Sequence, residues 1–173
     1  MKKLEIILSI LFLIGFIMKT LMLPGGSIIV ISTSLILSFV YFLSFAFFND
    51  IELKNIFKKD AYAHTTVKRI IGSEILGYGL AVTVMGIYSK LQFYLVANQL
   101  LSNGLTVVYI SMIIILIYHF RNKRKDWFYK RILIRTSIIL VIGTLLLITP
   151  FETLLDIYCW TNPEKAVLTK VHL

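Results

Sequence analysis

The apolar positions of this chain fall into five long runs that are separated by shorter polar segments. The runs cover residues 4–23, 28–48, 69–88, 97–120 and 132–149. Each run has roughly the 20 residues that an α-helix needs to cross the hydrocarbon core of a bilayer. The pattern therefore predicts an all-α, polytopic integral membrane protein with about five transmembrane helices.

Turn signals separate some of these runs. Pro24-Gly25-Gly26-Ser27 predicts a tight turn, because proline fixes one φ angle and glycine is free to take a positive one, so the first two helices should form an antiparallel hairpin. Residues 89–104 contain one charge and are compatible with an interfacial turn followed by a short helix, or with an early start of the fourth run. Pro150 should end the fifth run. Thr161-Asn162-Pro163-Glu164 combines a capping residue, a proline and an acid, which predicts a short helix through about Val171.

Two polar segments are too charged to lie in hydrocarbon. In residues 49–68, Asn49 is a suitable N-cap for a short helix with Leu53, Ile56 and Phe57 on one face and with lysines directed to lipid phosphates. We expect this helix to lie on the membrane surface. Residues 121–131 form the most basic stretch, and their aromatic side chains are typical of the headgroup region.

Composition and charge support the membrane interpretation. Hydrophobic residues make up 58% of the chain and charged residues 16%, against about 45–50% and about 25% in soluble domains. The formal net charge is +9. Most basic residues lie at the amino terminus and in the segments around 49–69 and 121–135, and those on the opposite side are Lys19, Lys90, Lys165 and Lys170. The positive-inside rule then places the amino terminus inside and the short carboxyl-terminal tail, residues 151–173, outside.

The basic segments also bear on partners. Membrane insertion explains them, so nucleic acid is not an expected partner. Anionic lipid headgroups at the inner face are expected partners, because each basic residue near the surface is attracted to them by about 1 kcal/mol. The expected location is the plasma (inner) membrane. Without repeats, low-complexity stretches or linkers, residues 1–173 are expected to form a single domain.

Signatures of enzymes and cofactor sites are not found in the sequence. It has no glycine-rich phosphate loop, no GxSxG and no HExxH, so we expect neither catalysis nor a cofactor. The lone cysteine, Cys159, excludes an internal disulfide and a cysteine metal cluster. Asp60, His64 and His119 all belong to the inner side and form a weak alternative metal set. Ordinary interface residues are the preferred interpretation of the two histidines.

The run from residue 69 to residue 88 carries the clearest packing signal. Ser73, Gly77 and Ala81 recur every four positions and form a stripe with almost no side chain, which we call the small-residue stripe. Such a stripe lets the backbone of a neighbouring helix approach closely. We therefore expect a helix-packing surface here.

Three of the charges in the predicted helices are candidate intramembrane charges. Glu74 and Arg135 each lie about one helical turn inside the inner boundary, on helices of the same direction, so they are expected at matching depth. They form a structural ion pair, or extend separately to the inner headgroups, or are part of an ion or proton site at the inner end of the bundle. Lys19 lies toward the outer end of the first helix, where its amine should extend to the outer headgroups.

One resemblance concerns the first hairpin. The string GFIMKTLMLPGGSIIVISTSLILSFVYF, residues 15–42, resembles the amino-terminal hairpin of the inner-membrane ring subunit of the gliding-motility and type IX secretion motor, and small uncharacterised multi-pass proteins that share it. In that family an apolar helix ends in a lysine shortly before a Pro/Gly turn, and Lys19 occupies this position. The resemblance covers roughly the first quarter of the chain. The family's second helix also contains a glutamate, which residues 28–48 lack.

Two classes of function follow. The first is a non-enzymatic membrane component, an accessory or structural subunit that docks on partner membrane helices, or on a second copy of itself, through the small-residue stripe. The alternative is a small-solute or proton carrier that uses Glu74, together with Arg135 and His119.

Overall fold

The computed structural model describes residues 2–21, 23–49, 51, 53–63, 65–121 and 127–161. Over these residues the chain forms seven α-helices and two short 3-10 helices. In chain order they are α1 (Lys2–Thr20), α2 (Gly26–Phe42), α3 (Ser44–Phe47), η1 (Leu53–Asn55), η2 (Lys59–Tyr62), α4 (Val67–Leu91), α5 (Ala97–Arg121), α6 (Trp127–Ile148) and α7 (Phe151–Thr161). The all-α class predicted from the sequence is confirmed.

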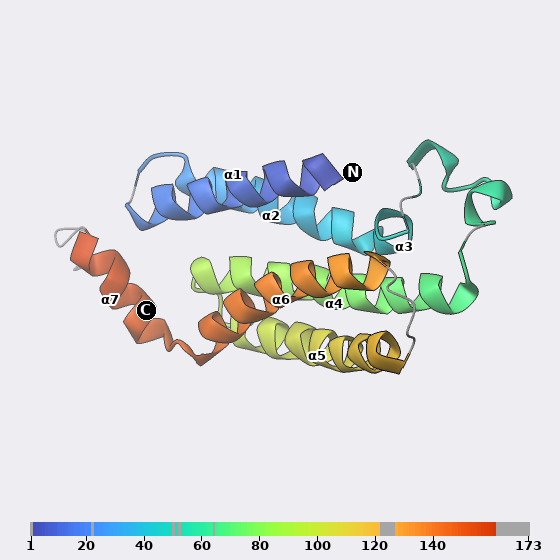
Figure 1. The fold of residues 1–173 in the computed structure, drawn as a ribbon. Coiled ribbons are helices and arrows are strands. Elements are labelled where there is room, and N and C mark those ends of the chain that lie inside the picture. Colours follow the sequence, from blue (N-terminus) through green and yellow to red (C-terminus); the bar gives the residue numbers. More distant parts are fainter. Residues whose placement is uncertain are drawn as a thin grey trace.

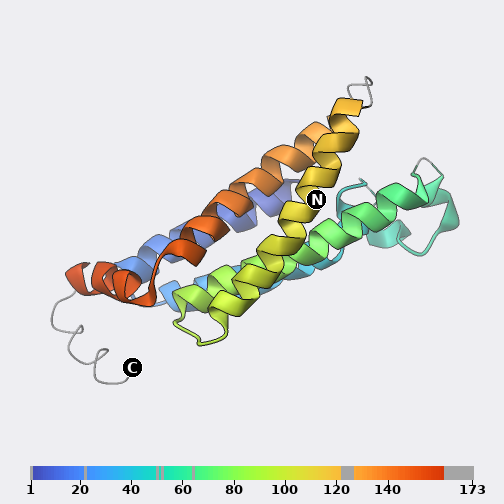
Figure 2. The same ribbon diagram turned by 90° about the horizontal axis from the view of Figure 1, so that it is seen from below.

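The long helices run side by side and the chain passes back and forth along one axis (Figure 1). The start of α1, the short helix α3 and the far end of α5 lie at one end of this bundle. The turn between α1 and α2, the turn between α4 and α5, and α7 lie at the other. Seen from below, α4 and α5 separate toward the end at which α4 begins (Figure 2).

The hairpin between α1 and α2 follows from its turn sequence. Gly25 has a φ of 87°, in the left-handed region that glycine adopts without steric cost. Gly26 begins α2 where the backbone of Met18 and Lys19 passes so closely that an added Cβ would overlap it. Both glycines of the motif are therefore required by the geometry of the turn.

The second apolar run is not one continuous helix. It divides at Leu43, whose φ and ψ of -92° and 28° leave the helical region between α2 and α3. The predicted surface helix after Asn49 is replaced by the two short 3-10 helices. Asn49 does not cap it: its Oδ1, the atom that would accept at a cap, accepts no hydrogen bond from the described residues, while its side-chain NH2 donates to the carbonyl oxygen of Phe45 at 2.7 Å and to Ser73 Oγ at 3.1 Å.

The end of the chain also differs from the expectation. Pro150 ends α6 as predicted, but the chain continues as α7, in a region that was expected to be a polar tail. The axes of residues 132–148 and 151–157 are bent by 100°. The short helix predicted from Thr161 to Val171 lies, beyond Thr161 itself, outside the described residues.

Length and composition identify which described helices can cross a membrane. α4 and residues 97–118 of α5 are each long and apolar enough to cross a membrane. The bent pair of α6 and α7 is so only if it is counted as one span. α2 is apolar but shorter. The part of the chain that the structure describes thus contains two or three candidate membrane spans, which makes a membrane location plausible.

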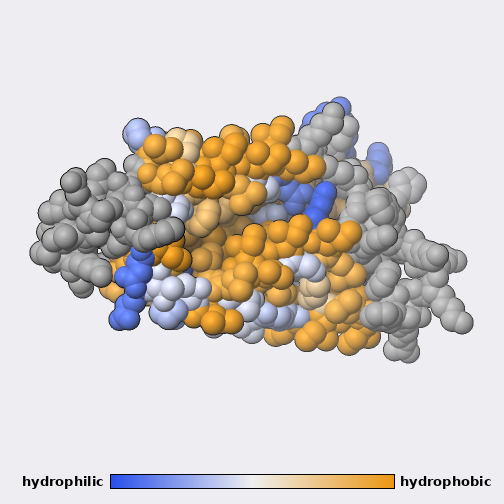
Figure 3. Space-filling view, turned by 60° about the vertical axis from the view of Figure 1, so that its left-hand side comes forward, coloured by the Kyte–Doolittle hydropathy of each residue, from blue (hydrophilic) through white to orange (hydrophobic). Residues whose placement is uncertain are grey.

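The core is organised around α4, which contacts α2, α3, α5 and α6. Leu76, Leu80 and Val84 of α4 are buried together with Tyr41 of α2 and Val108 of α5. Many large apolar side chains on α1, α5 and α6 point outward instead. They form much of the face in Figure 3, where apolar bands flank a hollow with hydrophilic atoms at one end. An exposed apolar surface of this extent suits contact with lipid or with other membrane helices.

Candidate functional site

The small-residue stripe is buried against helices of the same chain. A Cβ at Gly77 would collide with the side chain of Ser44 and the carbonyl oxygen of Tyr41. The carbonyl oxygen of Ala81 accepts a hydrogen bond from Ser38 Oγ at 3.3 Å. Ser73 Oγ accepts from the Asn49 amide at 3.1 Å. α2 and α3 of the same chain therefore pack on the stripe.

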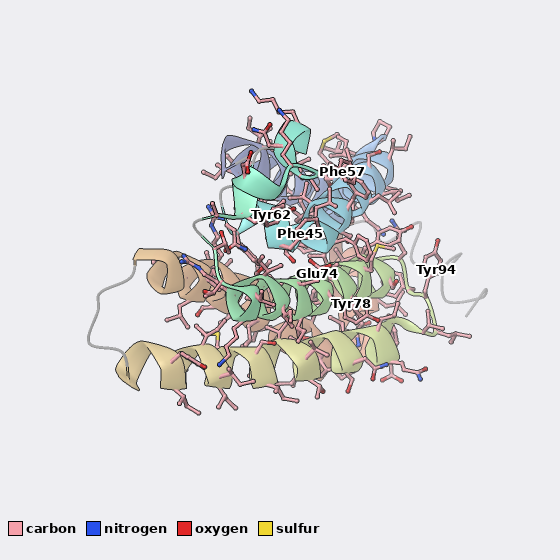
Figure 4. The ribbon with its side chains drawn as sticks, turned by 90° about the vertical axis from the view of Figure 1, so that its right-hand side faces the viewer. Phe45, Phe57, Tyr62, Glu74, Tyr78 and Tyr94 are labelled. Carbon is pink, nitrogen blue, oxygen red and sulfur yellow. The ribbon has the colours of Figure 1, made fainter. Side chains whose placement is uncertain are left out.

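Glu74 forms hydrogen bonds with the chain where it breaks between α2 and α3. Its Oε2 accepts hydrogen bonds from Ser44 Oγ at 3.1 Å and from the backbone N–H of Phe45 at 3.2 Å. Figure 4 shows Glu74 between α4 and the segment that carries Phe45. The first N–H groups of a helix lack intrahelical acceptors, and a carboxylate is favoured at this positive end. Glu74 thus caps α3 from the neighbouring helix.

Arg135 does not pair with Glu74, which corrects the expectation from their matching depth. Its Nη1 lies 3.0 Å from Oε2 of Glu5, a buried residue of α1. The other carboxylate oxygen of Glu5 accepts a hydrogen bond from the Tyr41 hydroxyl at 3.0 Å. The Arg135 guanidinium also lies 5.4 Å from the centre of the Phe47 ring. The reason is positional: α3 covers Glu74, whereas α1 presents Glu5 to α6.

This group of Glu5, Tyr41 and Arg135, which we call the inner polar cluster, joins α1, α2 and α6. Every charge in it has a partner, which offsets the large cost of removing ions from water. Sequence reasoning missed the role of Glu5 because the residue stands at the edge of an apolar run. The available signal was its depth: Glu5 stands near the start of the apolar run 4–23, as Arg135 stands near the start of the run 132–149, and both starts lie at the predicted inner end.

At the opposite end of the bundle, two lysines are held by the protein. The Lys19 amine donates a hydrogen bond to the carbonyl oxygen of Leu91, the last residue of α4, and does not simply extend toward headgroups. Lys90 is 1% exposed. Its amine lies 2.5 Å from Asn98 Oδ1 and 4.2 Å from the centre of the Phe151 ring. Cations at a helix C-terminus interact favourably with its partial negative charge.

A groove of about 650 Å³ opens between α4 and α5, at the end where these helices separate. Isoleucine side chains of both helices line it, and Lys68, Arg69 and Tyr118 lie toward the end at which α4 begins. A Cβ at Gly72 would meet no atom within 4 Å, so the groove reaches the backbone of α4. We call this the α4–α5 groove.

The alternative metal set of Asp60, His64 and His119 lies only partly within the described residues. Among the described residues, no group of three or more His, Cys, Asp or Glu side chains could hold a metal ion. His64 and the side chain of His119 lie outside the described part of the chain, as does the side chain of Cys159.

No known family, curated protein or solved structure matches this chain. The class is therefore defined by the fold alone: an all-α chain with two or three helices that are long and apolar enough to cross a membrane.

Proposed function

We propose that the chain is a non-enzymatic integral membrane protein that crosses the plasma (inner) membrane five times and acts as an accessory or structural component. The alternation of the long helices supports five crossings, since α1, α2 with α3, α4, α5 and α6 each run from one end of the bundle to the other. The basic positions Lys54, Lys58 and Lys68 belong to the end at which α1 begins. By the positive-inside rule this end is the inner one.

The observation that carries the proposal is the use of the charged side chains. Glu5 and Arg135 pair with each other, and Glu74 caps α3. Both acids stand near the inner end of their helices, and the sequence of α2 contains no charge at all. A carrier needs ionisable groups that reach its path and exchange partners during transport. The charged side chains of Glu5, Glu74 and Arg135 instead form contacts that connect one helix of the bundle to another.

Partners would meet the outward faces of the bundle. Since α2 and α3 occupy the small-residue stripe, a partner helix or a second copy would contact the apolar faces of α1, α5 or α6. Anionic headgroups would meet the basic inner end. Contacts with partner helices and with lipid headgroups are those expected of an accessory or structural component of the membrane.

The test is a flux measurement on the purified full-length chain in liposomes that contain a pH-sensitive dye. Under an imposed potassium diffusion potential, we expect the same proton flux as in liposomes without protein, for the natural chain and for Glu74→Gln. A proton flux in the natural chain that Glu74→Gln or Glu5→Gln abolishes would establish the carrier alternative and overturn the proposal.

A further inference from the structure

The α4–α5 groove is lined mainly by apolar side chains, with Ser73 and Ser111 among them, and is basic at its mouth. Ile71 and Ile75 of α4 face it from one side and Ile114 of α5 from the other, and Lys68 at the mouth is exposed. Its volume of about 650 Å³ lies in the range of sites that take small molecules. A matching ligand would be apolar over most of its length and negatively charged at one end.

The length of the groove corresponds to one leaflet of a bilayer. From Thr66 to Leu76 the helix rises about 15 Å, at about 1.5 Å per residue. The hydrocarbon core of a bilayer is about 30 Å thick, so this is about half of it. In the proposed orientation the mouth of the groove lies at the inner headgroups, and its apolar walls lie along the inner-leaflet acyl chains.

Gly72 leaves the space that an acyl chain would fill. Helical glycines at contacts usually face a neighbouring backbone, as Gly77 does, but an added Cβ at Gly72 meets no atom within 4 Å. Ile71, Gly72 and Ile75 are exposed, so the groove opens to the surface of the bundle, where an acyl chain of the surrounding bilayer would meet it.

We propose that the α4–α5 groove binds one anionic phospholipid of the inner leaflet. One acyl chain lies against Ile71, Ile75 and Ile114, and the phosphate lies at the Lys68 ammonium. Charge complementarity selects a headgroup with a net negative charge over a zwitterionic one, whose own ammonium would face Lys68. This inference deepens the proposed contact with anionic headgroups and rests on the proposed membrane orientation.

Native mass spectrometry of the full chain in mild detergent tests the site, with dioleoylphosphatidylglycerol as the anionic probe and dioleoylphosphatidylcholine as its zwitterionic counterpart. We expect one phosphatidylglycerol per chain, bound in preference to phosphatidylcholine. Lys68→Gln should weaken its binding about fivefold, the effect of one basic residue near an anionic surface. Gly72→Phe should abolish binding by filling the groove from within.

Two matched controls accompany these variants. Lys58→Gln removes the same charge from the same end but outside the groove, and Gly72→Ala adds one methyl group; both should retain the lipid. Equal weakening by Lys58→Gln and Lys68→Gln, or full retention in Gly72→Phe, would overturn the proposal. So would a dimer that Gly72→Phe dissociates, since a second copy would then occupy the groove.

Two further measurements keep the result interpretable. If circular dichroism shows that Gly72→Phe does not fold, the comparison of lipid binding by Lys68→Gln and Lys58→Gln tests the site without it. The proton flux of the same preparations is recorded separately. A chain that binds the lipid and also carries protons would overturn the proposed function but not the lipid site. A chain that neither carries protons nor binds the lipid would overturn the lipid site but not the proposed function.

Discussion

Arg135 Nη1 lies 3.0 Å from Glu5 Oε2, and this ion pair joins the first long helix of the chain to the last. At the opposite end of α1, the Lys19 amine binds the carbonyl oxygen of Leu91 at the end of α4. α1 is therefore anchored at both ends by charged side chains, while its middle packs against α2. The charges that look anomalous in an apolar sequence have structural partners.

Removal of one member of the ion pair should be more harmful than removal of both. Glu5→Leu leaves the Arg135 guanidinium without its carboxylate, and we expect a loss of about 2 kcal/mol in the free energy of unfolding, below the range for fully buried pairs because Arg135 is partly exposed. The double variant Glu5→Leu, Arg135→Leu should recover most of this loss. A double-mutant cycle from unfolding in detergent measures the coupling, and purely additive effects would contradict the account.

Two glycines of α4 should respond in opposite ways to the same substitution. Gly77→Ala places a methyl group against Ser44 and the backbone of Tyr41, so we expect a destabilisation of about 1–3 kcal/mol from overpacking. Gly72→Ala meets open space and should be neutral or stabilising by up to about 1 kcal/mol through helix propensity. Thermal unfolding of both variants in the same detergent checks the difference. Similar melting temperatures would show that α2 and α3 do not pack on Gly77.

The cap at Glu74 depends on an acceptor more than on a charge. Glu74→Gln keeps an oxygen for the Phe45 N–H and the Ser44 hydroxyl, and we expect a loss below about 1 kcal/mol. Glu74→Leu leaves both donors without an acceptor and should cost about 1–3 kcal/mol. Hydrogen exchange at the start of α3 should accelerate in the leucine variant alone. Unchanged exchange there would contradict a capping role.

The contact of Lys19 with the end of α4 should also be measurable. Lys19→Met keeps the length of the side chain but removes the donor to Leu91, and we expect a loss of about 1 kcal/mol. Lys58→Met, at an exposed position, is the matched control and should have little effect. Equal melting temperatures of the two variants would contradict the contact.

The sequence predicted the helices better than their junctions. The fourth predicted run, 97–120, agrees closely with α5, and the positive φ of Gly25 fits the predicted turn. The break at Leu43 could not be predicted from residues 28–48, which carry no charge and contain no proline or glycine, because it depends on the Glu74 carboxylate from another helix. α7 was missed because Pro150 ends one helix and also allows another to begin directly after it.

The sequence singled out some residues of the candidate site but not their pairings. Glu74, Arg135 and the small-residue stripe were all identified, yet depth along a helix does not determine which neighbour a side chain faces. That depends on helix rotation and on the order of helices around the bundle, which follow from packing across the whole core. Glu5 had the depth to partner Arg135, but only the placement of α1 beside α6 brings the two together.

The most direct test of the central claim is the sidedness of three engineered cysteines in a Cys159→Ala background. Leu23, Phe57 and Leu95 are exposed at successive ends of the bundle, with exposed fractions of 48%, 99% and 95%. A membrane-impermeant maleimide applied to intact cells should label Leu23→Cys and Leu95→Cys at once, and Phe57→Cys only after permeabilisation. Labelling of Phe57→Cys from the same side as the other two would contradict the proposed crossings, and labelling of Phe57→Cys alone would reverse the orientation.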